Sequence, residues 1–425
     1  MLTLYNLFVI PLLRVVASVA AKWNPKFKLA VEGRARLQQE VVDHYAIVAP
    51  SRKRFLIHVS SFGELEQAKP VIARLKESDP QAHIHLTFFS PSGYQNAIGK
   101  YDLPDIITYA PFDSLTDVRA FLDVVRPNVG LFVRYDLWPN IAHELHERRI
   151  PSVLFSATFD PKRANIFVRS FHRSTYNQLT KILTISEFDK KQFENFGVAV
   201  PEIIQVGDTR FDQVITRKAS IEMKSSDYLS KAITDTWREH GMFVLVAGST
   251  WPGDETLLAD YIEGAHERKE SFVSIIAPHE PTHEHILKLK QTFGSNGILL
   301  SECANYNDEK VVIVDSVGKL FSLYQYATVA YVGGGFEAGV HNVLEPAAWG
   351  KPVVVGPKNE RSQEVKNLID AGGGFEATGV GEFSKVITKL YSDTSYTLKA
   401  GEIAASFIEN QSGATDRIMR EVTAL

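Results

Sequence analysis

Residues 331–357, YVGGGFEAGVHNVLEPAAWGKPVVVGP, carry the clearest fold pattern in the chain. The apolar and β-branched residues 328–332 predict a short buried strand, and the three glycines that follow permit a tight turn and a close backbone approach to a ligand. A short helix is expected to begin at Pro346, because proline suits the first helical position, and to stop at Gly350. Residues 353–355 predict another buried strand. This unit is typical of a parallel α/β sheet, which binds ligands at the carboxyl ends of its strands.

Asn342 and Glu345 lie in the loop of this unit and permit two interpretations. Their N-x-x-E spacing is that of a capping box, in which the two side chains satisfy backbone N–H groups at a helix start and no ligand is needed. Pro346 argues against a cap at Asn342, because the proline would stand where an intrahelical N–H is wanted. A ligand-binding role for Asn342 and Glu345 is therefore as well supported as a capping role.

Strand and helix patterns alternate along most of the chain. Strands are expected at residues 55–59, 83–89, 106–109, 129–133, 152–155 and 182–185, and again at 242–247, 272–277, 311–314, 328–332 and 353–355. Helical patterns such as 115–125 and 140–148 lie between them, whereas residues 215–240 are polar and helical without strong strands. The alternation predicts the α/β class, with two doubly wound parallel sheets joined near residues 215–240.

Length and composition set the broad class. A chain of 425 residues suggests two domains rather than one core. A hydrophobic content of 44% and a charged content of 23% are those of a soluble globular protein. The single cysteine, Cys303, excludes an internal disulfide framework and a cysteine-based metal site, and it favours a reducing compartment.

The amino-terminal segment differs from the rest of the chain. Residues 2–21 are mostly apolar, but Pro11 and Arg14 interrupt them, and no charged segment with a cleavage site marks a signal peptide. Residues 1–60 carry nine lysines and arginines against three acids, a net charge of +6. We expect residues 1–30 to dock on a membrane surface without being needed for folding, with basic side chains meeting anionic headgroups. The alternative is a buried amphipathic first helix.

A second loop with chemical potential is SSFGELE, residues 60–66, which follows the first predicted strand. By itself the pair Ser61 and Glu64 forms a good capping box. Glu64 also follows a glycine at a strand-to-helix junction, where its carboxylate can reach a cleft and accept a proton. The nearby helix N-terminus favours the ionised carboxylate, so a low pKa is expected.

Other motifs exclude several site types. HEPTH, residues 279–283, matches H-E-x-x-H, but Pro281 lies inside the turn that would place both histidines on one helical face, so we expect a substrate-facing loop and no metal site. Neither a dinucleotide G-x-G-x-x-G fingerprint nor a P-loop occurs. A single phosphate needs only one helix N-terminus, which the turn at 248–254 or the loop at 333–345 could supply.

Together these motifs resemble the 3-deoxy-D-manno-octulosonic acid (Kdo) transferases, lipopolysaccharide enzymes of the GT-B class. The resemblance covers nearly the whole chain and is carried by SSFGELE at 60–66, DLWPN at 136–140, GDTRFD at 207–212, GST at 248–250, HNVLEPAAWGKP at 341–352 and GP at 356–357. The chain departs from the family where Glu-x-Glu reads RYD at 134–136, where Asn-Leu-Lys reads DTR at 208–210, and where Pro-Arg-His reads PHE at 278–280.

The resemblance implies a GT-B fold with two Rossmann-like domains facing a cleft. The expected parts are a membrane-associating helical segment at 1–30, an acceptor-binding domain at 31–214, a connection at 215–240, a nucleotide-sugar-binding domain at 241–405, and a carboxy-terminal helix at 406–425 that crosses back to the first domain.

The resemblance further implies an inverting transfer of Kdo from CMP-Kdo to a lipid A precursor, lipid IVA, at the cytoplasmic face of the inner membrane of a Gram-negative-type bacterium. The implied partners are CMP-Kdo, the lipid and the membrane surface, with no nucleic acid, metal or cofactor. Glu64 is the implied general base, and Arg210 would stabilise the leaving phosphate. The implied substrate-binding residues are Ser60, Ser61, Gly63, Asp136, Ser249, Thr250, Pro278, His279, Gly334, Gly335, His341, Asn342 and Glu345.

Two other classes of function stay open. A nucleotide-sugar epimerase could use the same two-domain fold and would change the donor without a lipid acceptor, although the basic, apolar amino end argues against it. A non-catalytic lipid-binding protein would keep that amino end but would tolerate the loss of Glu64 and Glu345.

Overall fold

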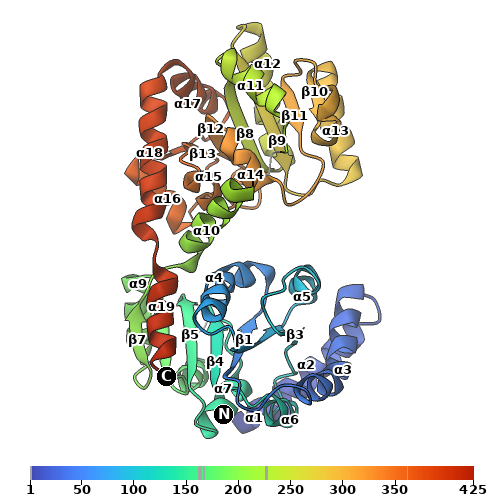
Figure 1. Ribbon diagram of the computed structural model, residues 1–425, viewed down its shortest axis with the longest axis vertical. Coiled ribbons are helices and arrows are strands. Elements are labelled where there is room, and N and C mark those ends of the chain that lie inside the picture. The colour runs from blue at the N-terminus through green and yellow to red at the C-terminus, as the bar shows by residue number, and fades with distance from the viewer. Residues whose placement is uncertain (1, 161–164, 166–167, 225–227, 361) are drawn as a thin grey trace. The chain divides into compact units, whose positions relative to one another are not determined.

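The computed structural model describes residues 2–160, 165, 168–224, 228–360 and 362–425. The chain forms two compact units, one of Met1–Gln213 with Ser412–Leu425 and the other of Val214–Gln411. Each unit contains one seven-stranded parallel sheet with helices around it (Figure 1).

The sheet of the first unit has the strand order β3-β2-β1-β4-β5-β6-β7. Its strands are β1 (Arg54–Val59), β2 (His83–Phe88), β3 (Ile106–Tyr109), β4 (Val129–Val133), β5 (Ser152–Ala157), β6 (Lys181–Thr184) and β7 (Glu202–Gln205). Its described helices are α1 (Leu2–Leu4), the π-helical turn η1 (Tyr5–Val9), α2 (Ile10–Ala20), α3 (Pro25–Tyr45), α4 (Phe62–Ser78), α5 (Pro91–Ala97), α6 (Leu115–Val125), α7 (Pro139–Glu147), α8 (Arg169–Tyr176), α9 (Glu187–Phe196), the start of α10 (Thr209–Lys224), and α19 (Ala414–Thr423). β1, β2, β4 and β5 are buried along their whole length, because helices cover both faces of the sheet.

The sheet of the second unit has the order β10-β11-β9-β8-β12-β13-β14. Its strands are β8 (Phe243–Thr250), β9 (Phe272–Pro278), β10 (Gly297–Leu299), β11 (Val311–Ile313), β12 (Val329–Val332), β13 (Val353–Val355) and β14 (Gly374–Glu376). Its described α-helices, after the end of α10, are α11 (Lys231–Glu239), α12 (Pro252–Glu267), α13 (His283–Phe293), α14 (Leu320–Leu323), α15 (Leu344–Ala348), α16 (Gln363–Ala371), α17 (Val380–Ser392) and α18 (Thr394–Gln411). The α/β class with two parallel sheets is therefore confirmed.

Residues 215–240 are predicted as an inter-domain connection, and the described ones belong to the second unit. They complete α10 and form α11, and Ile233 and Trp237 of α11 pack into the hydrophobic core of the second unit, where Trp237 is only 4% exposed. The helix reads as polar in the sequence because only one of its faces is buried.

The carboxy-terminal helix is tied to the first unit by Asp212. Its carboxylate accepts hydrogen bonds from the backbone N–H of Gly413, at 2.5 Å, and of Thr415, at 2.6 Å. Ile418 and Val422 of α19 then pack in the core beside α4. This arrangement places α19 against the helix that begins at the SSFGELE loop.

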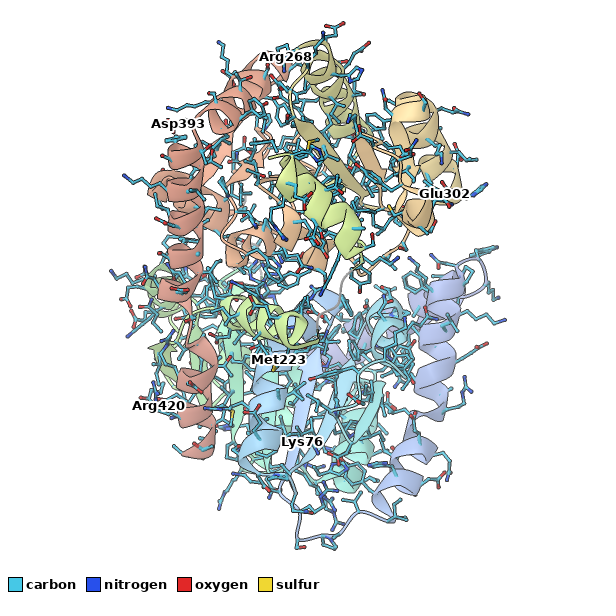
Figure 2. The ribbon with its side chains drawn as sticks, turned by 45° about the horizontal axis from the view of Figure 1, so that its top comes forward. Lys76, Met223, Arg268, Glu302, Asp393 and Arg420 are labelled. Carbon is cyan, nitrogen blue, oxygen red and sulfur yellow. The ribbon has the colours of Figure 1, made fainter. Side chains whose placement is uncertain are left out.

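An ion-pair cluster lies at the amino ends of β1, β2 and β3. Asp105, just before β3, accepts from Lys76 Nζ at 2.6 Å, from Arg52 Nη2 at 3.0 Å and from the Ile84 N–H at 2.8 Å (Figure 2 labels Lys76). Burial alone would raise the pKa of Asp105, but the bonds from Lys76 and Ile84 lower it below its ordinary value. The cluster thus joins α4 to β2 and β3.

Candidate active site

Glu64 lies in the first turn of α4, at the carboxyl end of β1, and it forms the capping box that the sequence predicts. Ser61 Oγ accepts from the Glu64 N–H at 3.4 Å, and Glu64 Oε2 accepts from the Ser60 N–H at 2.5 Å. The carboxylate is 5% exposed. The Ser60 N–H thus fixes one oxygen of this carboxylate.

The sequence predicts a low pKa for Glu64, but the pKa is raised to about 7. Burial is the largest cause, because it disfavours the charged form, and the nearby Asp136 raises the pKa further. The Ser60 N–H, Arg134 and the Ser61 N–H act in the opposite direction without overcoming burial. A carboxylate with this pKa is well matched to general-base catalysis near neutral pH.

Gly63 precedes Glu64 on the surface of this loop. A Cβ atom at Gly63 would meet nothing nearer than Ser61 Oγ, at 3.9 Å. Packing therefore does not require a glycine at this position, and an open approach to the Glu64 carboxylate is a sufficient reason for one.

Asp136 approaches the same sheet edge from the loop after β4. Its Oδ2 lies 3.9 Å from Nε2 of His58, a β1 residue that is 2% exposed. Burial lowers the pKa of His58 to about 3, with a further contribution from Arg34, so this histidine is neutral at physiological pH. Asp136 and Glu64 are thus brought into one electrostatic neighbourhood, as their predicted positions at adjacent strand ends require.

Arg210 lies in the first turn of α10, but its guanidinium is held by a neighbour. Nη2 pairs with Asp208 Oδ2 at 2.7 Å, and Nε donates to the same oxygen at 2.8 Å. The adjacent Thr209 Oγ1 donates to the Gln67 carbonyl at 2.7 Å, which places this loop beside the start of α4. Arg210 therefore lies in the region of Glu64 but already has a carboxylate partner.

In the second unit, polar side chains meet at the carboxyl ends of β8 and β9. Thr250, which is fully buried, donates from Oγ1 to Glu255 Oε1 at 2.9 Å, and Glu255 Oε2 lies 2.8 Å from His285 Nε2. The other nitrogen of His285 lies 3.0 Å from the Glu280 carbonyl oxygen, which can only accept. His285 must therefore donate from Nδ1 and share a proton with Glu255 through Nε2.

An aromatic stack adjoins this group and includes Trp251, which was not among the predicted site residues. Trp251 Nε1 donates to His341 Nε2 at 2.9 Å, and the two rings are nearly coplanar. His279 stacks on both, with centroids 5.1 Å from Trp251 and 4.4 Å from His341. Burial, with a smaller contribution from His279, lowers the pKa of His341 to about 4, so its ring is neutral and carries its proton on Nδ1.

These two groups border a cavity of about 380 Å³ whose lining includes Thr250, Trp251, His279, Glu280, His285 and Glu337. Pro278 is buried at the end of β9, directly before His279. The cavity lies at the carboxyl ends of parallel strands, where the sequence predicts a ligand.

The three glycines after β12 are buried and serve packing. A Cβ atom at Gly333 would lie 2.5 Å from the Ser249 carbonyl oxygen, and one at Gly335 would lie 2.5 Å from the Gly356 Cα. Gly334 has a φ of 92°, and its N–H donates to the buried Asp254 Oδ2 at 2.8 Å. Protein backbone therefore lies on the Cβ side of Gly334 and Gly335, and their approach to a ligand stays a prediction.

The capping box at Asn342 and Glu345 does not form. Helix α15 begins at Leu344 rather than at Pro346, and Asn342 Oδ1 accepts from the Leu344 N–H at 3.1 Å, which is a local turn. Glu345 Oε1 instead pairs with Arg217 Nη1 at 3.0 Å, and that guanidinium lies 4.4 Å from the centroid of the Phe321 ring. The cap is absent, as Pro346 predicts. Arg217 was not predicted as the partner of Glu345, because it lies in the segment expected to connect the domains.

The H-E-x-x-H segment does not form a helical pair of histidines. His283 is the first residue of α13, and Glu280 and Pro281 precede that helix. Among the residues that the structure describes, no group of three or more histidine, cysteine, aspartate or glutamate side chains is arranged to hold a metal ion.

Comparison with known proteins gives consistent matches. The family model described as 3-deoxy-D-manno-octulosonic-acid transferase (kdotransferase) matches residues 22–213. A 3-deoxy-D-manno-octulosonic acid transferase of Haemophilus influenzae is 22% identical over 396 residues, which cover 90% of this chain and 91% of the relative. The enzyme of the same name from Aquifex aeolicus is 25% identical over 358 residues, which cover 83% of this chain and 91% of the relative.

Among solved structures, the UDP-GlcNAc 2-epimerase of Neisseria meningitidis has a TM-score of 0.61 with 15% sequence identity, over 88% of this chain and all of that chain. At this identity the similarity shows the fold, which is of the GT-B class, and nothing of the activity. The family match covers residues 22–213, and both relatives cover most of the chain. The family match over residues 22–213, with relatives that cover 83% and 90% of the chain, identifies it as an enzyme similar to the Kdo transferases.

Proposed function

We propose that the enzyme transfers Kdo from CMP-Kdo to a lipid A precursor, lipid IVA, by an inverting displacement in which Glu64 is the general base. The observation that supports this most directly is the state of Glu64. It is a buried carboxylate at a strand end, its Oε2 is fixed by the Ser60 N–H, and burial raises its pKa to about 7. The relatives are named as Kdo transferases, so Kdo is the proposed transferred group and CMP-Kdo the proposed donor.

In the proposed reaction, Glu64 takes the proton of the acceptor hydroxyl as the hydroxyl oxygen attacks the anomeric carbon of Kdo. The bond between that carbon and the phosphate oxygen breaks at the same time, and CMP leaves with the electron pair. Asp136 keeps Glu64 basic by disfavouring a second negative charge nearby. Arg210 stabilises the leaving phosphate if it exchanges part of its contact with Asp208 for the phosphate.

An assay of the donor separates this proposal from the epimerase alternative. CMP-Kdo is incubated with the enzyme with and without lipid IVA, and released CMP is measured. We expect CMP release to depend on the lipid. Lipid-independent conversion of CMP-Kdo would contradict the proposed transfer and favour chemistry on the donor alone.

We further propose that Asn342, Glu345, Ser249, Thr250, His279 and His341 bind the donor, with Glu345 accepting hydrogen bonds from the ribose hydroxyls. Glu345→Gln should then weaken CMP binding by about 1–3 kcal/mol, the value of a lost charge-assisted hydrogen bond. Isothermal calorimetry with CMP measures the change, and Glu263→Gln on the exposed face of α12 is the matched control.

Glu345 pairs with Arg217, so its role could be to hold that arginine rather than to bind the donor. The variant Arg217→Gln distinguishes these two roles. If Glu345 only holds Arg217, both variants lower the Tm alike and leave the CMP affinity unchanged. That result would contradict the ribose assignment.

The amino-terminal helices supply the proposed membrane-docking surface. Leu2–Ala20 is long and apolar enough to cross a membrane, with a mean hydropathy of 1.8, yet only 6% of it is buried. Leu7, Phe8 and Leu12 are each more than 60% exposed. The buried-first-helix alternative is therefore wrong, and an apolar surface open to lipid is the reading that the exposure favours.

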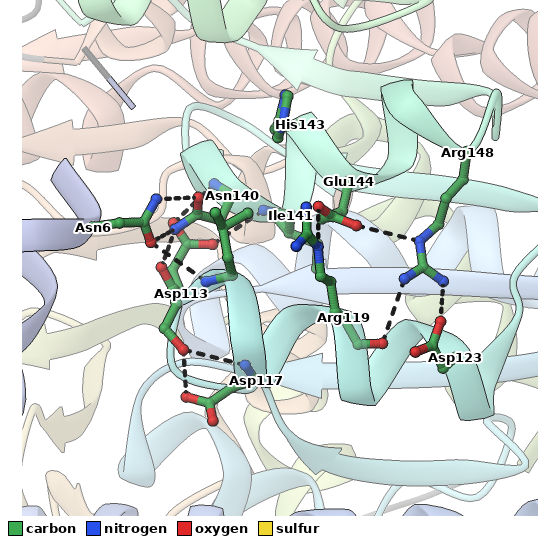
Figure 3. Close-up of polar contacts among 12 residues, drawn as sticks. Asn6, Asp113, Asp117, Arg119, Asp123, Asn140, Ile141, His143, Glu144 and Arg148 are labelled. Atoms are coloured by element: carbon green, nitrogen blue, oxygen red, sulfur yellow. Dashed lines mark hydrogen bonds and ion pairs between the residues drawn. The ribbon is translucent and has the colours of Figure 1, made fainter. Parts of the chain in front are cut away.

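Polar side chains hold this segment against the first unit (Figure 3). Tyr5 Oη donates to Asp113 Oδ2 at 3.0 Å, and the side-chain amides of Asn6 and Asn140 bond each other reciprocally at 2.8 Å. Asp113 also accepts from the Asn140 and Ile141 N–H groups. A segment with its polar side chains on the protein and its apolar ones outward suits an interfacial anchor, and we propose that it lies on the cytoplasmic face of the inner membrane.

This network also argues against the expectation that residues 1–30 are dispensable for folding. Asp113 is 5% exposed and Asn140 is fully buried, so removing Tyr5 and Asn6 would take one hydrogen bond from the Asp113 carboxylate and the reciprocal pair from the Asn140 amide. Substitution of exposed apolar residues is therefore a cleaner test than deletion.

The variant Leu7→Gln, Phe8→Gln, Leu12→Gln should lower the vesicle partition coefficient at least about 100-fold, because three large apolar side chains no longer enter lipid. Its Tm should change little, since these side chains are exposed. Flotation with phospholipid vesicles measures the partition. Leu398→Gln, which alters a 64% exposed leucine on α18, is the control and should float like the wild type. Unchanged flotation of the triple variant would contradict membrane docking through this surface.

A further inference from the structure

A second cavity, of about 370 Å³, lies in the first unit among α2, α3, α6 and the segment after β3. Its lining includes Arg14, Arg34, Gln38, Phe112, Asp117 and Phe121. The α2 helix on its border exposes Val15, Val16 and Val19. The cavity therefore combines two guanidinium groups with a neighbouring apolar surface.

Arg34 is held in this cavity by neutral groups. Nε donates to the Ala110 carbonyl at 3.0 Å, Nη2 to the Phe89 carbonyl at 2.8 Å, and Nη1 to the Ala30 carbonyl at 3.3 Å. The guanidinium carbon also lies 4.9 Å from the Phe89 ring centroid and 5.2 Å from that of Phe112. These contacts orient the guanidinium without neutralising its charge.

The ion pairs recorded within the described part of the chain give Arg34 no carboxylate partner, whereas Arg14 pairs with Asp117 and also donates to Ser114 Oγ at 3.1 Å. Burial lowers the pKa of Arg34 to about 10, which still leaves it protonated at neutral pH. With Arg14 and Asp117 cancelling each other, the cavity carries one uncompensated positive charge. A partly buried cation of this kind is stabilised by an anion.

We propose that this cavity binds the phosphate group of a membrane lipid, with Arg34 as the main ligand and Arg14 as a second one. A guanidinium has five N–H donors, and three of those of Arg34 are used by carbonyls, so two remain for phosphate oxygens. The apolar face of α2 would accommodate the acyl chains. The inference rests on the proposed docking of this surface on a membrane.

A series of hydrogen bonds connects this site with the proposed general base. Arg34 binds the Phe89 carbonyl, the Phe89 N–H donates to the Val59 carbonyl, and Ser60, next in sequence, holds Glu64. A lipid phosphate at Arg34 would therefore orient a phosphorylated lipid near the strand edge that carries Glu64.

The test measures binding of dodecyl phosphate by the full-length enzyme with calorimetry, below the detergent's critical micelle concentration. Inorganic phosphate and the uncharged dodecyl maltoside are separate arms. We expect dodecyl phosphate to bind most tightly, which identifies a lipid phosphate rather than free phosphate. Equal affinity for inorganic phosphate would overturn the lipid assignment, and equal affinity for dodecyl maltoside would overturn the phosphate assignment.

Variants assign the site to residues. Arg34→Gln should weaken dodecyl phosphate binding about 10-fold or more, as loss of a charge-assisted pair requires, while Arg36→Gln, on the exposed face of the same helix, should match the wild type. Asp117→Asn removes the carboxylate that competes for Arg14 and should tighten binding about 3-fold. Because a folding defect cannot strengthen binding, this variant keeps the test decisive if Arg34→Gln fails to fold.

Equal binding by Arg34→Gln and the wild type, or weaker binding by Asp117→Asn, would overturn the proposal. The outcome is distinct from that of the proposed function. If binding depends on Arg34 but the enzyme transfers no Kdo, the phosphate site is supported and the transferase assignment is contradicted. If the enzyme transfers Kdo but binding does not depend on Arg34, the transferase assignment is supported and the phosphate site is contradicted.

Discussion

Glu64→Gln should lower the rate of Kdo transfer by ~10²–10⁴-fold while CMP binding and Tm stay close to those of the wild type. Glutamine keeps an oxygen that can accept from the Ser60 N–H, as Glu64 Oε2 does at 2.5 Å, so the capping geometry survives. It cannot take up the proton of an acceptor hydroxyl. The loss should therefore appear in the chemical step, and single-turnover transfer from CMP-Kdo to lipid measures it.

The control for this substitution is Glu77→Gln, which changes an exposed glutamate near the end of the same helix and should leave the rate within about 2-fold of the wild type. Near wild-type transfer by a folded Glu64→Gln protein would reduce Glu64 to a cap. Glu66, which pairs with Lys69 and accepts from Gln213 at 3.1 Å, would then be the next carboxylate to test.

The second large effect is on the pH dependence of kcat/KM. Burial raises the pKa of Glu64 above its ordinary value of 4.5 to about 7, so the carboxylate binds its proton below pH 7 and is available as a base above it. The rate should fall about tenfold for each pH unit below 7 and level off above it. His58, with a pKa lowered to about 3, does not titrate in this range.

Initial rates between pH 5 and 8, corrected with an enzyme-free sample for loss of the donor, test this profile. The residual rate of Glu64→Gln should show no change of slope near pH 7. A wild-type rate that is constant down to pH 5 would show that the catalytic base has an ordinary carboxylate pKa and would contradict the role given to burial.

The sequence predicts the interior of both sheets well, because strands buried on both faces are continuous apolar runs. The strands it misses are β7, β10 and β14, which lie at sheet edges; β7 is only partly covered and β10 and β14 have three residues each. Short strands with an open face carry too few apolar residues to stand out.

At the site, the sequence identifies the loops but not the partners within them. The capping box at Ser61 and Glu64 is local and was predictable, whereas the raised pKa of Glu64 depends on burial by residues far along the chain. Likewise, Arg217 pairs with Glu345 across 128 residues, and Trp251 bonds His341 across 90. Such contacts leave no spacing signal in a single sequence.

The glycines after β12 can be explained either by close approach to a ligand or by close packing against another backbone segment. Glycine is required there, as the sequence indicates, but the close neighbours of Gly333 and Gly335 are Ser249 and Gly356 of the protein itself. Only the fold distinguishes close approach to a ligand from close approach to another backbone segment.

The most direct test of the central proposal is mass spectrometry of lipid IVA after incubation with CMP-Kdo and the enzyme. We expect a lipid product heavier than lipid IVA by one or more whole Kdo residues, formed together with an equal amount of CMP. This product should be absent when Glu64→Gln replaces the wild type for the same time. An unmodified lipid in the presence of a folded wild-type enzyme that binds CMP would contradict it.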